Sequence, residues 1–273
     1  MSIPFLPMND GRRIPQLGLG VYKVKNSQAT DVVLAAFEAG YRHVDTAALY
    51  GNERGVGNAM RSSGLARDDI FVTTKVWNDD HGYDKTLRAF DTSMRKLGLD
   101  RVDLYLIHWP SPRQDRYLDT WRALETLRDE GRATSIGVSN FHTQHLDRLL
   151  AESSVVPVLN QVELHPWLPQ RTVREYGAAH GMLTEAWSPL ARGRLLDDAV
   201  LARLAAKHGK SPAQVVIRWH LQLGNVVIPK SVTPARIREN IDVFDFELDA
   251  GDLAAIAGLE SGERTGLDPN NNG

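Results

Sequence analysis

YRHVDTAALYGN, residues 41–52, is the stretch around which the rest of the chain can be interpreted. It reads as one strand, its exit loop and the start of the next helix. Asp45 ends the strand, and Tyr50 follows in the exit loop. A carboxylate at a strand end with a phenol a few residues later is not explained by stability alone. The pattern predicts a functional site whose other members come from elsewhere in the chain.

The same strand-then-helix unit repeats along the sequence. Eight short apolar runs are strand candidates: QLGLGV from Gln16, YRHVDTA from Tyr41, IFVTTKV from Ile70, VDLYLIH from Val102, ATSIGVS from Ala133, PVLNQVEL from Pro157, LTEAWSP from Leu183 and VVIPKS from Val226. Helix patterns separate them, such as the one that begins with the capping box Ser211-Pro212-Ala213-Gln214. Alternating units imply parallel strands with crossover helices. Eight closely spaced strands favour an α/β fold of the (β/α)8 TIM-barrel type over an open sheet.

Three additions to the basic barrel are expected. An N-terminal β-hairpin, about residues 4–15, is predicted around the turn Asn9-Asp10-Gly11 and would cap the barrel. An extra helix is predicted from about Asp197 to His208. Without a linker or composition break, residues 1–273 are expected to form a single domain with a loosely ordered tail, about 262–273.

Composition narrows the function classes. The 273 residues carry a net charge of −2 with both signs interspersed, which gives no nucleic-acid footprint and no polybasic membrane patch. The absence of cysteine excludes disulfides, thiolate metal sites and a cysteine nucleophile. The first residues lack the unbroken apolar run of a signal peptide, so a cytoplasmic location is expected.

Catalytic groups of such barrels lie at the carboxyl ends of the strands. Lys75 ends the third predicted strand and His108 the fourth, so both should meet Asp45 and Tyr50. A lysine about 4 Å from a tyrosine, at an effective dielectric of about 20, is worth at most roughly 4 kcal/mol, or about three pKa units. Lys75 is therefore expected to lower the pKa of Tyr50, with Asp45 keeping the lysine protonated.

These four groups suit a reaction in which negative charge grows on one oxygen that is then protonated. A neutral His108 can donate one hydrogen bond to that oxygen and fix its angle. Reduction of a carbonyl by hydride fits this requirement.

Long collinear motifs between about Val21 and Phe246 support the same chemistry. They are GYRHVDTAALYGNE, TTKVWN, VDLYLIHWP, SIGVSNF, NQVELHP and IPKSVTPARIRENIDVFDFEL. On these motifs the chain resembles the aldo-keto reductase superfamily, and most closely its bacterial 2,5-diketo-D-gluconic acid reductase group. The resemblance implies a monomeric NADPH-dependent reductase of an α-dicarbonyl, keto-sugar or small aldehyde. The family's catalytic residues correspond to Asp45, Tyr50, Lys75 and His108, with Tyr50 as general acid.

The resemblance also implies cofactor contacts along the chain. The positions for the nicotinamide are Ser139, Asn140 and Gln161 at its carboxamide and Trp187 on its ring, and those for the pyrophosphate loop are Ser188 and Leu190. The positions for the 2′-phosphate are Lys230, Ser231 and Arg236, and those for adenine are Glu239 and Asn240. The chemistry agrees, because a helix N-terminus after Thr233-Pro234 and a guanidinium both suit a phosphate.

Several other residues receive different interpretations. Tyr22, Trp77 and Trp109 follow strand ends and are predicted to line the substrate pocket. His43 and Glu185 should point into the barrel, the first as a structural residue and the second without an assigned role. No metal is predicted, since His142 and His145 share a helix face without a neighbouring carboxylate.

Two other functions are compatible with a barrel. A glycosidase would use two carboxylates among Asp45, Glu163 and Glu185, but this leaves Lys75 without a role and places no acid at the fourth strand end. A non-catalytic NADP(H)-sensing regulatory subunit of the same fold is the second alternative. The complete set of four polar residues argues against that alternative.

Overall fold

Eight parallel strands form the centre of the structure, a computed structural model that describes residues 3–271. The strands are β3 (Leu19–Gly20), β4 (His43–Asp45), β5 (Phe71–Val76), β6 (Val102–Ile107), β7 (Ala133–Ser139), β8 (Leu159–Glu163), β9 (Leu183–Trp187) and β10 (Val226–Val227). They pair in sequence order, and a parallel bridge between Leu17 and Val227 joins the last strand to the first. Each predicted run contains one strand, so the predicted barrel is confirmed.

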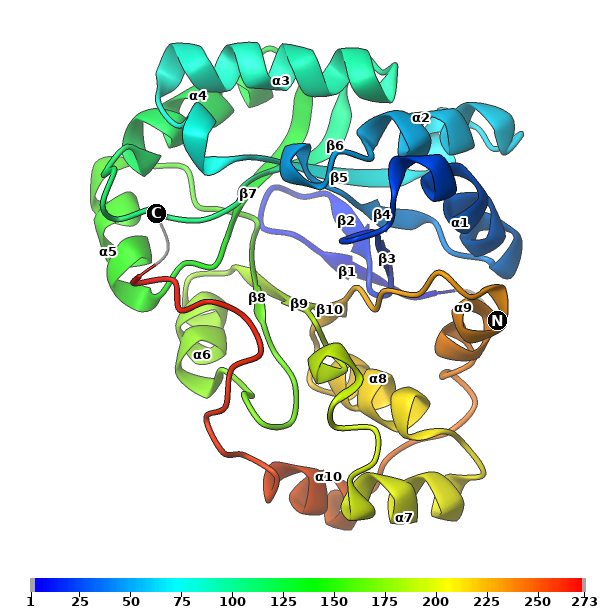
Figure 1. Cartoon of the computed structure of the whole chain (residues 1–273). Helices are drawn as coiled ribbons and strands as arrows, with labels where there is room; N and C mark the ends of the chain where they lie inside the picture. Colours follow the sequence, from blue (N-terminus) through cyan, green and yellow to red (C-terminus); the bar gives the residue numbers. More distant parts are fainter. Residues whose placement is uncertain (1–2, 272–273) are drawn as a thin grey trace.

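The helices form an outer ring around the strands (Figure 1). They are α1 (Asn26–Ala39), α2 (Glu53–Ser62), α3 (Tyr83–Leu97), α4 (Tyr117–Asp129), α5 (Thr143–Glu152), α6 (Arg171–Ala179), α7 (Ala199–His208), α8 (Pro212–Gln222), α9 (Pro234–Ile241) and α10 (Ala250–Ala257). Helix α7 is the extra helix that the sequence predicts. The capping box at Ser211 is present, with Ser211 Oγ accepting from Gln214 N and Gln214 Oε1 accepting from Ser211 N.

The strands separate two apolar layers. Outward side chains such as Val44, Val72 and Ile107 belong to the core between the strands and the helices. Leu104 and Leu106 point inward and pack with Met8 and Ile14 of the N-terminal hairpin, whose strands are β1 (Phe5–Pro7) and β2 (Arg13–Pro15). The predicted hairpin therefore closes the amino-terminal end of the barrel, and the carboxyl ends of the strands are left for a site.

None of the helices within residues 3–271 has the length and apolar character needed to cross a membrane.

Candidate active site

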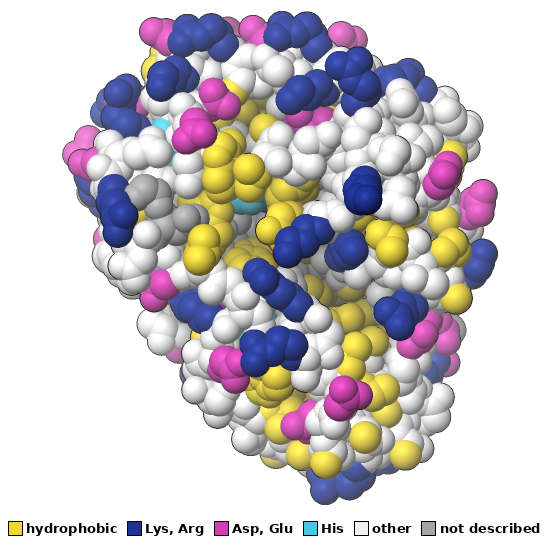
Figure 2. Space-filling model, viewed as in Figure 1, with side chains coloured by type: hydrophobic (Ala, Val, Ile, Leu, Met, Phe, Trp, Pro, Cys, Tyr) yellow, Lys and Arg dark blue, Asp and Glu magenta, His cyan; other side chains and the backbone are white. Residues whose placement is uncertain are grey.

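A cavity of about 840 Å³ opens at the carboxyl ends of the strands. Figure 2 shows it as a hollow at the centre of the face, with hydrophobic side chains inside and Lys and Arg side chains along its rim. All the residues that the sequence predicts for catalysis, cofactor and substrate line this cavity, except Lys75. The side chain of Lys75 lies behind Asp45 and is fully buried. One continuous space therefore brings the predicted residues together.

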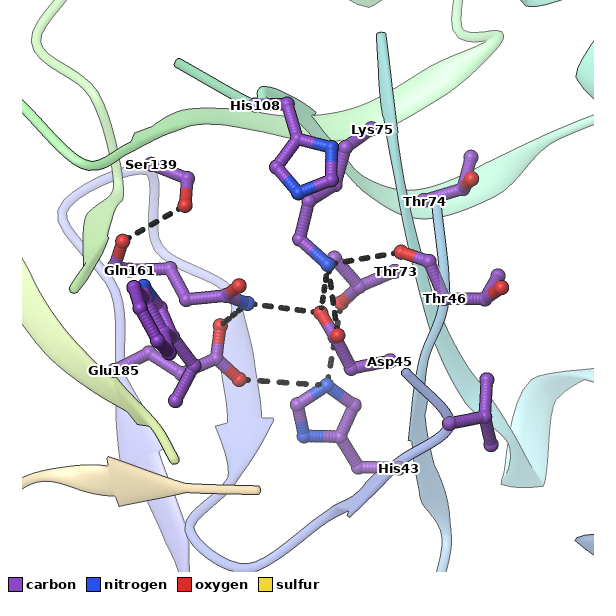
Figure 3. A network of polar contacts seen from close by, with 12 residues as sticks. His43, Asp45, Thr46, Thr73, Thr74, Lys75, His108, Ser139, Gln161 and Glu185 are labelled. Carbon is purple, nitrogen blue, oxygen red and sulfur yellow. Dashed lines mark hydrogen bonds and ion pairs between the residues drawn. The ribbon is translucent and has the colours of Figure 1, made fainter. Parts of the chain in front are cut away.

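Asp45 and Lys75 form a buried ion pair at the base of the cavity (Figure 3). Lys75 Nζ donates to Asp45 Oδ1 and Oδ2, both at 2.7 Å, and to the carbonyl oxygen of Thr46 at 2.9 Å. These three bonds use every hydrogen of the ammonium group. Burial raises the pKa of Asp45, while the charge of Lys75 opposes that rise. Because both carboxylate oxygens contact the ammonium, Asp45 is the ionised carboxylate of the cluster.

Tyr50 ends a short 3-10 helix, η1 (Ala48–Tyr50), above this pair. Lys75 Nζ lies 5.1 Å from the centre of its ring. Burial, followed by the charge of Asp45, raises the pKa of Tyr50 well above 10.0. The expectation that Lys75 lowers this pKa is wrong, because burial and the charge of Asp45 both raise it. Tyr50 consequently holds its proton throughout the neutral pH range.

His108 faces the same space from the end of β6. Its ring lies 5.6 Å from that of Tyr50 and 5.1 Å from that of Trp77, both edge to face. Burial, followed by the charge of Lys75, lowers the pKa of His108 well below 6.5. The imidazole is therefore neutral at pH 7 and can donate one hydrogen bond into the cavity.

The residues predicted for the nicotinamide amide are already joined by hydrogen bonds. Asn140 Nδ2 donates to the carbonyl oxygen of His108 and to Ser139 Oγ, and Asn140 Oδ1 accepts from Trp187 Nε1 at 2.9 Å. Ser139 Oγ donates to the carbonyl oxygen of Gln161. Asn140 has a φ of 65°, a left-handed conformation that asparagine tolerates better than most residues. This network fixes the position of Trp187 against the cavity.

Positively charged side chains also line the cavity. Lys230 and Ser231 follow β10, and Arg236 lies in the first turns of α9. The side chains of Lys230 and Arg236 are exposed at the rim, and the N-terminus of α9 adds its partial positive charge. Glu239 and Asn240 line the cavity one turn further along the helix. The donor set fits a phosphate with an adjoining polar ring.

The walls of the cavity contain other predicted residues and also residues that the sequence did not predict. Tyr22, Trp77 and Trp109 line the cavity as predicted. Ser188 and Leu190 belong to a loop whose residues Ser188, Ala191 and Arg192 all have positive φ. The sequence did not predict Lys23, Leu49, Arg192 or Gly193 as lining residues. The strand-end pattern predicts that the first residues after a strand line the site. It gives no information on residues further along a longer loop.

The C-terminal tail also contributes to the site, through a contact that the sequence did not predict. Glu163 at the end of β8 is buried and accepts hydrogen bonds from Thr265 N at 2.6 Å, Thr265 Oγ1 at 2.5 Å and Gly266 N at 3.1 Å. A Cβ atom on Gly266 would lie 2.4 Å from Trp187 Cη2, so only glycine fits there without a shift. Gly266 and Leu267 thereby form part of the cavity wall.

This geometry does not suit a glycosidase. Asp45 is paired with Lys75, Glu163 holds the tail, and Glu185 is fully buried beneath the cavity. No two carboxylates among them flank a space for a glycosidic bond. His142 and His145 pack against each other, with ring centres 6.0 Å apart, and residues 3–271 contain no group of three or more His, Asp or Glu side chains arranged for a metal.

Comparison with known proteins places the chain in a family. Residues 16–261 match the model of the Aldo/keto reductase family. The chain is 52% identical to a protein of Yersinia pestis named Methylglyoxal reductase DkgA, covering 97% of this chain and 96% of that one. It is also 52% identical to the Glyoxal reductase of Bacillus subtilis, covering 96% and 95%. The crystal structure of a mutant of Gox0644 in complex with NADPH superposes with a TM-score of 0.95, at 49% identity over 99% of each chain. The family and subgroup that the motifs predicted are confirmed, and the chain belongs to the aldo/keto reductase family.

Proposed function

We propose that the protein reduces the carbonyl group of an aldehyde or ketone to the alcohol, with NADPH as the reductant. The observation that carries the proposal is the convergence of Tyr50, His108 and the Asp45–Lys75 pair at a cavity that is also lined by Lys230 and Arg236. Relatives named for methylglyoxal and glyoxal reduction support α-dicarbonyls as the first substrates to test, followed by keto-sugars and small aldehydes.

The chemistry of the residues that line the cavity fits NADPH. Lys230, Ser231 and Arg236 would hold the 2′-phosphate, and Glu239 and Asn240 would contact the adenine. Ser188 and Leu190 would cover the pyrophosphate, while Ser139, Asn140 and Gln161 would bind the carboxamide beside the Trp187 ring. When bound there, NADPH supplies the hydride. A charge-specific contact with the 2′-phosphate supports a preference for NADPH over NADH.

The protein's own groups then act on the substrate oxygen. His108 donates a hydrogen bond that fixes the carbonyl angle, and the hydroxyl of Tyr50 transfers its proton to the oxygen as negative charge grows there. Tyr50 can do so because it stays protonated at neutral pH. The Asp45–Lys75 pair lies within reach of the phenol ring and makes its environment polar without a net charge.

A direct assay tests the proposal. Purified protein mixed with NADPH and a panel of aldehydes, α-dicarbonyls and keto-sugars should consume the cofactor, measured by its absorbance. The Tyr50→Phe variant should lose about 10²–10⁴-fold in turnover, the contribution of one general acid, while its affinity for NADPH stays nearly unchanged. Tyr83→Phe, at an exposed tyrosine of α3, is the matched control and should behave as the wild type.

Each alternative predicts a different result. Binding of NADPH without reduction of any carbonyl would favour the non-catalytic sensing subunit. No binding would refute the cofactor assignment, and near-normal turnover of Tyr50→Phe would refute the acid assignment.

The remaining proposals concern the state of the protein. We propose a single-domain monomer in the cytoplasm, supported by the family resemblance. Sedimentation at micromolar concentration tests the monomer, and a dimer mass would contradict it.

A further inference from the structure

Glu185 is a buried titratable residue that the proposed mechanism does not use. It lies in the middle of β9, and its side chain has no exposed surface. Its neighbours across the sheet are Gln161 on β8 and Val226 on β10. Figure 3 shows its carboxyl group pointing into the barrel beside Gln161 and above His43. A buried carboxyl group is costly unless other groups pair with it, so its partners decide its role.

The amide of Gln161 bridges two carboxyl groups. Gln161 Nε2 donates to Glu185 Oε2 at 2.7 Å and to Asp45 Oδ2 at 2.8 Å. An amide nitrogen has two hydrogens, so both are used. Only Gln161 Oε1 remains to bind a ligand in the cavity, which Gln161 lines.

Within residues 3–271, no cation contacts Glu185. The three hydrogen bonds of Lys75 all go to Asp45 and Thr46. Glu185 Oε1 lies 3.7 Å from His43 Nε2, and burial lowers the pKa of His43 to about 3, so that ring is neutral. Burial, followed by the negative charge of Asp45, raises the pKa of Glu185 to about 8. At pH 7 Glu185 therefore keeps its proton, and the buried cluster has no net charge.

We propose that Glu185 is a positioning residue for the cofactor, which together with Asp45 turns both N–H groups of Gln161 inward and fixes Gln161 Oε1 toward the cavity. There Oε1 accepts a hydrogen bond from the carboxamide of nicotinamide. The inference rests on the proposed NADPH-dependent function and adds to it a residue outside the cavity lining. Removing the Glu185 carboxyl leaves one N–H of Gln161 unpaired and lets the amide turn, which weakens cofactor binding.

Ionisation of Glu185 has a second consequence. The titratable groups that face it are His43 and Asp45 from β4, Lys75 from β5 and Tyr50 above. When Glu185 ionises, its charge adds to that of Asp45 and further opposes negative charge at Tyr50. Reduction places growing negative charge on the substrate oxygen beside Tyr50. The rate of reduction should therefore fall as pH rises through about 8.

Two substitutions separate these effects. Glu185→Leu removes the acceptor, and Glu185→Gln keeps an acceptor oxygen but cannot ionise. The control is Glu53→Gln, at a buried glutamate that accepts from Thr74 Oγ1 at 2.8 Å on the outer side of the barrel. The dissociation constant for NADPH is measured by quenching of tryptophan fluorescence, and kcat and KM are measured from pH 6 to 10.

Glu185→Leu should weaken NADPH binding about tenfold, as expected for one lost hydrogen bond. Glu185→Gln should bind NADPH within about threefold of the wild type, and its decline in kcat/KM should move upward by at least about one pH unit. Glu53→Gln should match the wild type in both measurements. A purely structural role would leave the pH profile of Glu185→Gln unchanged.

Unchanged NADPH affinity in Glu185→Leu would overturn the inference, as would a pH profile of Glu185→Gln that superposes on the wild type. If Glu185→Leu does not fold, the profile of Glu185→Gln decides. If the wild type itself does not bind NADPH, the proposed function is overturned. If the wild type binds NADPH and the variants behave in the same way, only the inference about Glu185 is overturned.

Discussion

Removing either member of the Asp45–Lys75 pair should destabilise the protein strongly. The two side chains are 2% and 0% exposed, and the ammonium nitrogen lies 2.7 Å from each carboxylate oxygen. At this distance and an effective dielectric of about 20, the attraction is about 6 kcal/mol. Desolvation offsets much of that energy, but deleting one partner leaves the other as an unpaired buried charge. The expected loss in the free energy of unfolding is about 3–5 kcal/mol for Asp45→Asn or Lys75→Met at pH 7.

The double variant Asp45→Asn/Lys75→Met should lose about 2 kcal/mol less than the sum of the two single losses, because it leaves no unpaired charge. Urea unfolding followed by tryptophan fluorescence measures all three free energies, and the chain has six tryptophans. The slope against urea should stay constant across the series, which shows that the change lies in stability.

An exposed ion pair provides the control. Arg101 Nη2 lies 2.5 Å from Asp68 Oδ1, with side chains 49% and 82% exposed. Asp68→Asn or Arg101→Met should cost at most about 1 kcal/mol. Equal losses at the buried and exposed pairs would refute the argument from burial. Strict additivity of the two buried substitutions would refute the coupling between Asp45 and Lys75.

Three further predictions follow from the site. Arg236→Ala should raise the dissociation constant for NADPH far more than that for NADH, as measured by fluorescence titration; equal effects would place Arg236 away from the 2′-phosphate. Gly266→Ala should displace the tail from Trp187 and raise the KM for bulky carbonyls more than the KM for small ones. The control is Gly262→Ala, because a Cβ atom at Gly262 would have no atom within 4 Å and the substitution therefore tests for backbone strain alone. Oxidation of an alcohol by NADP⁺ requires Tyr50 to lose its proton. Because the pKa of Tyr50 is raised, the rate of oxidation should still increase with pH at about pH 10. A rate that reaches a plateau near pH 7 would contradict this prediction.

The fold could be predicted because its signals are local. The period of two within the strand that holds Val72 and Thr73 assigned one side chain to the outer core and the other to the barrel interior, and the structure agrees. The capping box at Ser211 marked the start of α8 from four consecutive residues. Parallel strands align their carboxyl ends, so the positions of Asp45, Lys75 and His108 in the sequence sufficed to bring them together.

The direction of each hydrogen bond could not be predicted in the same way. The sequence placed Lys75 near Tyr50 but did not show that Thr46 O and both oxygens of Asp45 take all its donors. Burial of Tyr50, followed by the charge of Asp45, raises the pKa that Lys75 was expected to lower. Hydrogen bonds depend on angles and distances of a few tenths of an ångström, which a strand-end pattern does not specify.

Glu163 and Glu185 show that the strand pattern predicts the position of a carboxyl group but not its protonation state. Both point inward from neighbouring strands, and both are buried. Burial alone would raise the pKa of each, but hydrogen bonds from His165 and Thr265 outweigh it at Glu163 and hold that pKa below 4.5. At Glu185, burial and the charge of Asp45 outweigh the single hydrogen bond from Gln161, so its pKa rises to about 8. Thr265 lies 102 positions from Glu163 in a polar tail without strand or helix signals. The ionised anchor and the protonated carboxyl therefore differ in the number of donors that they receive, and one of these donors, Thr265, is distant in the sequence.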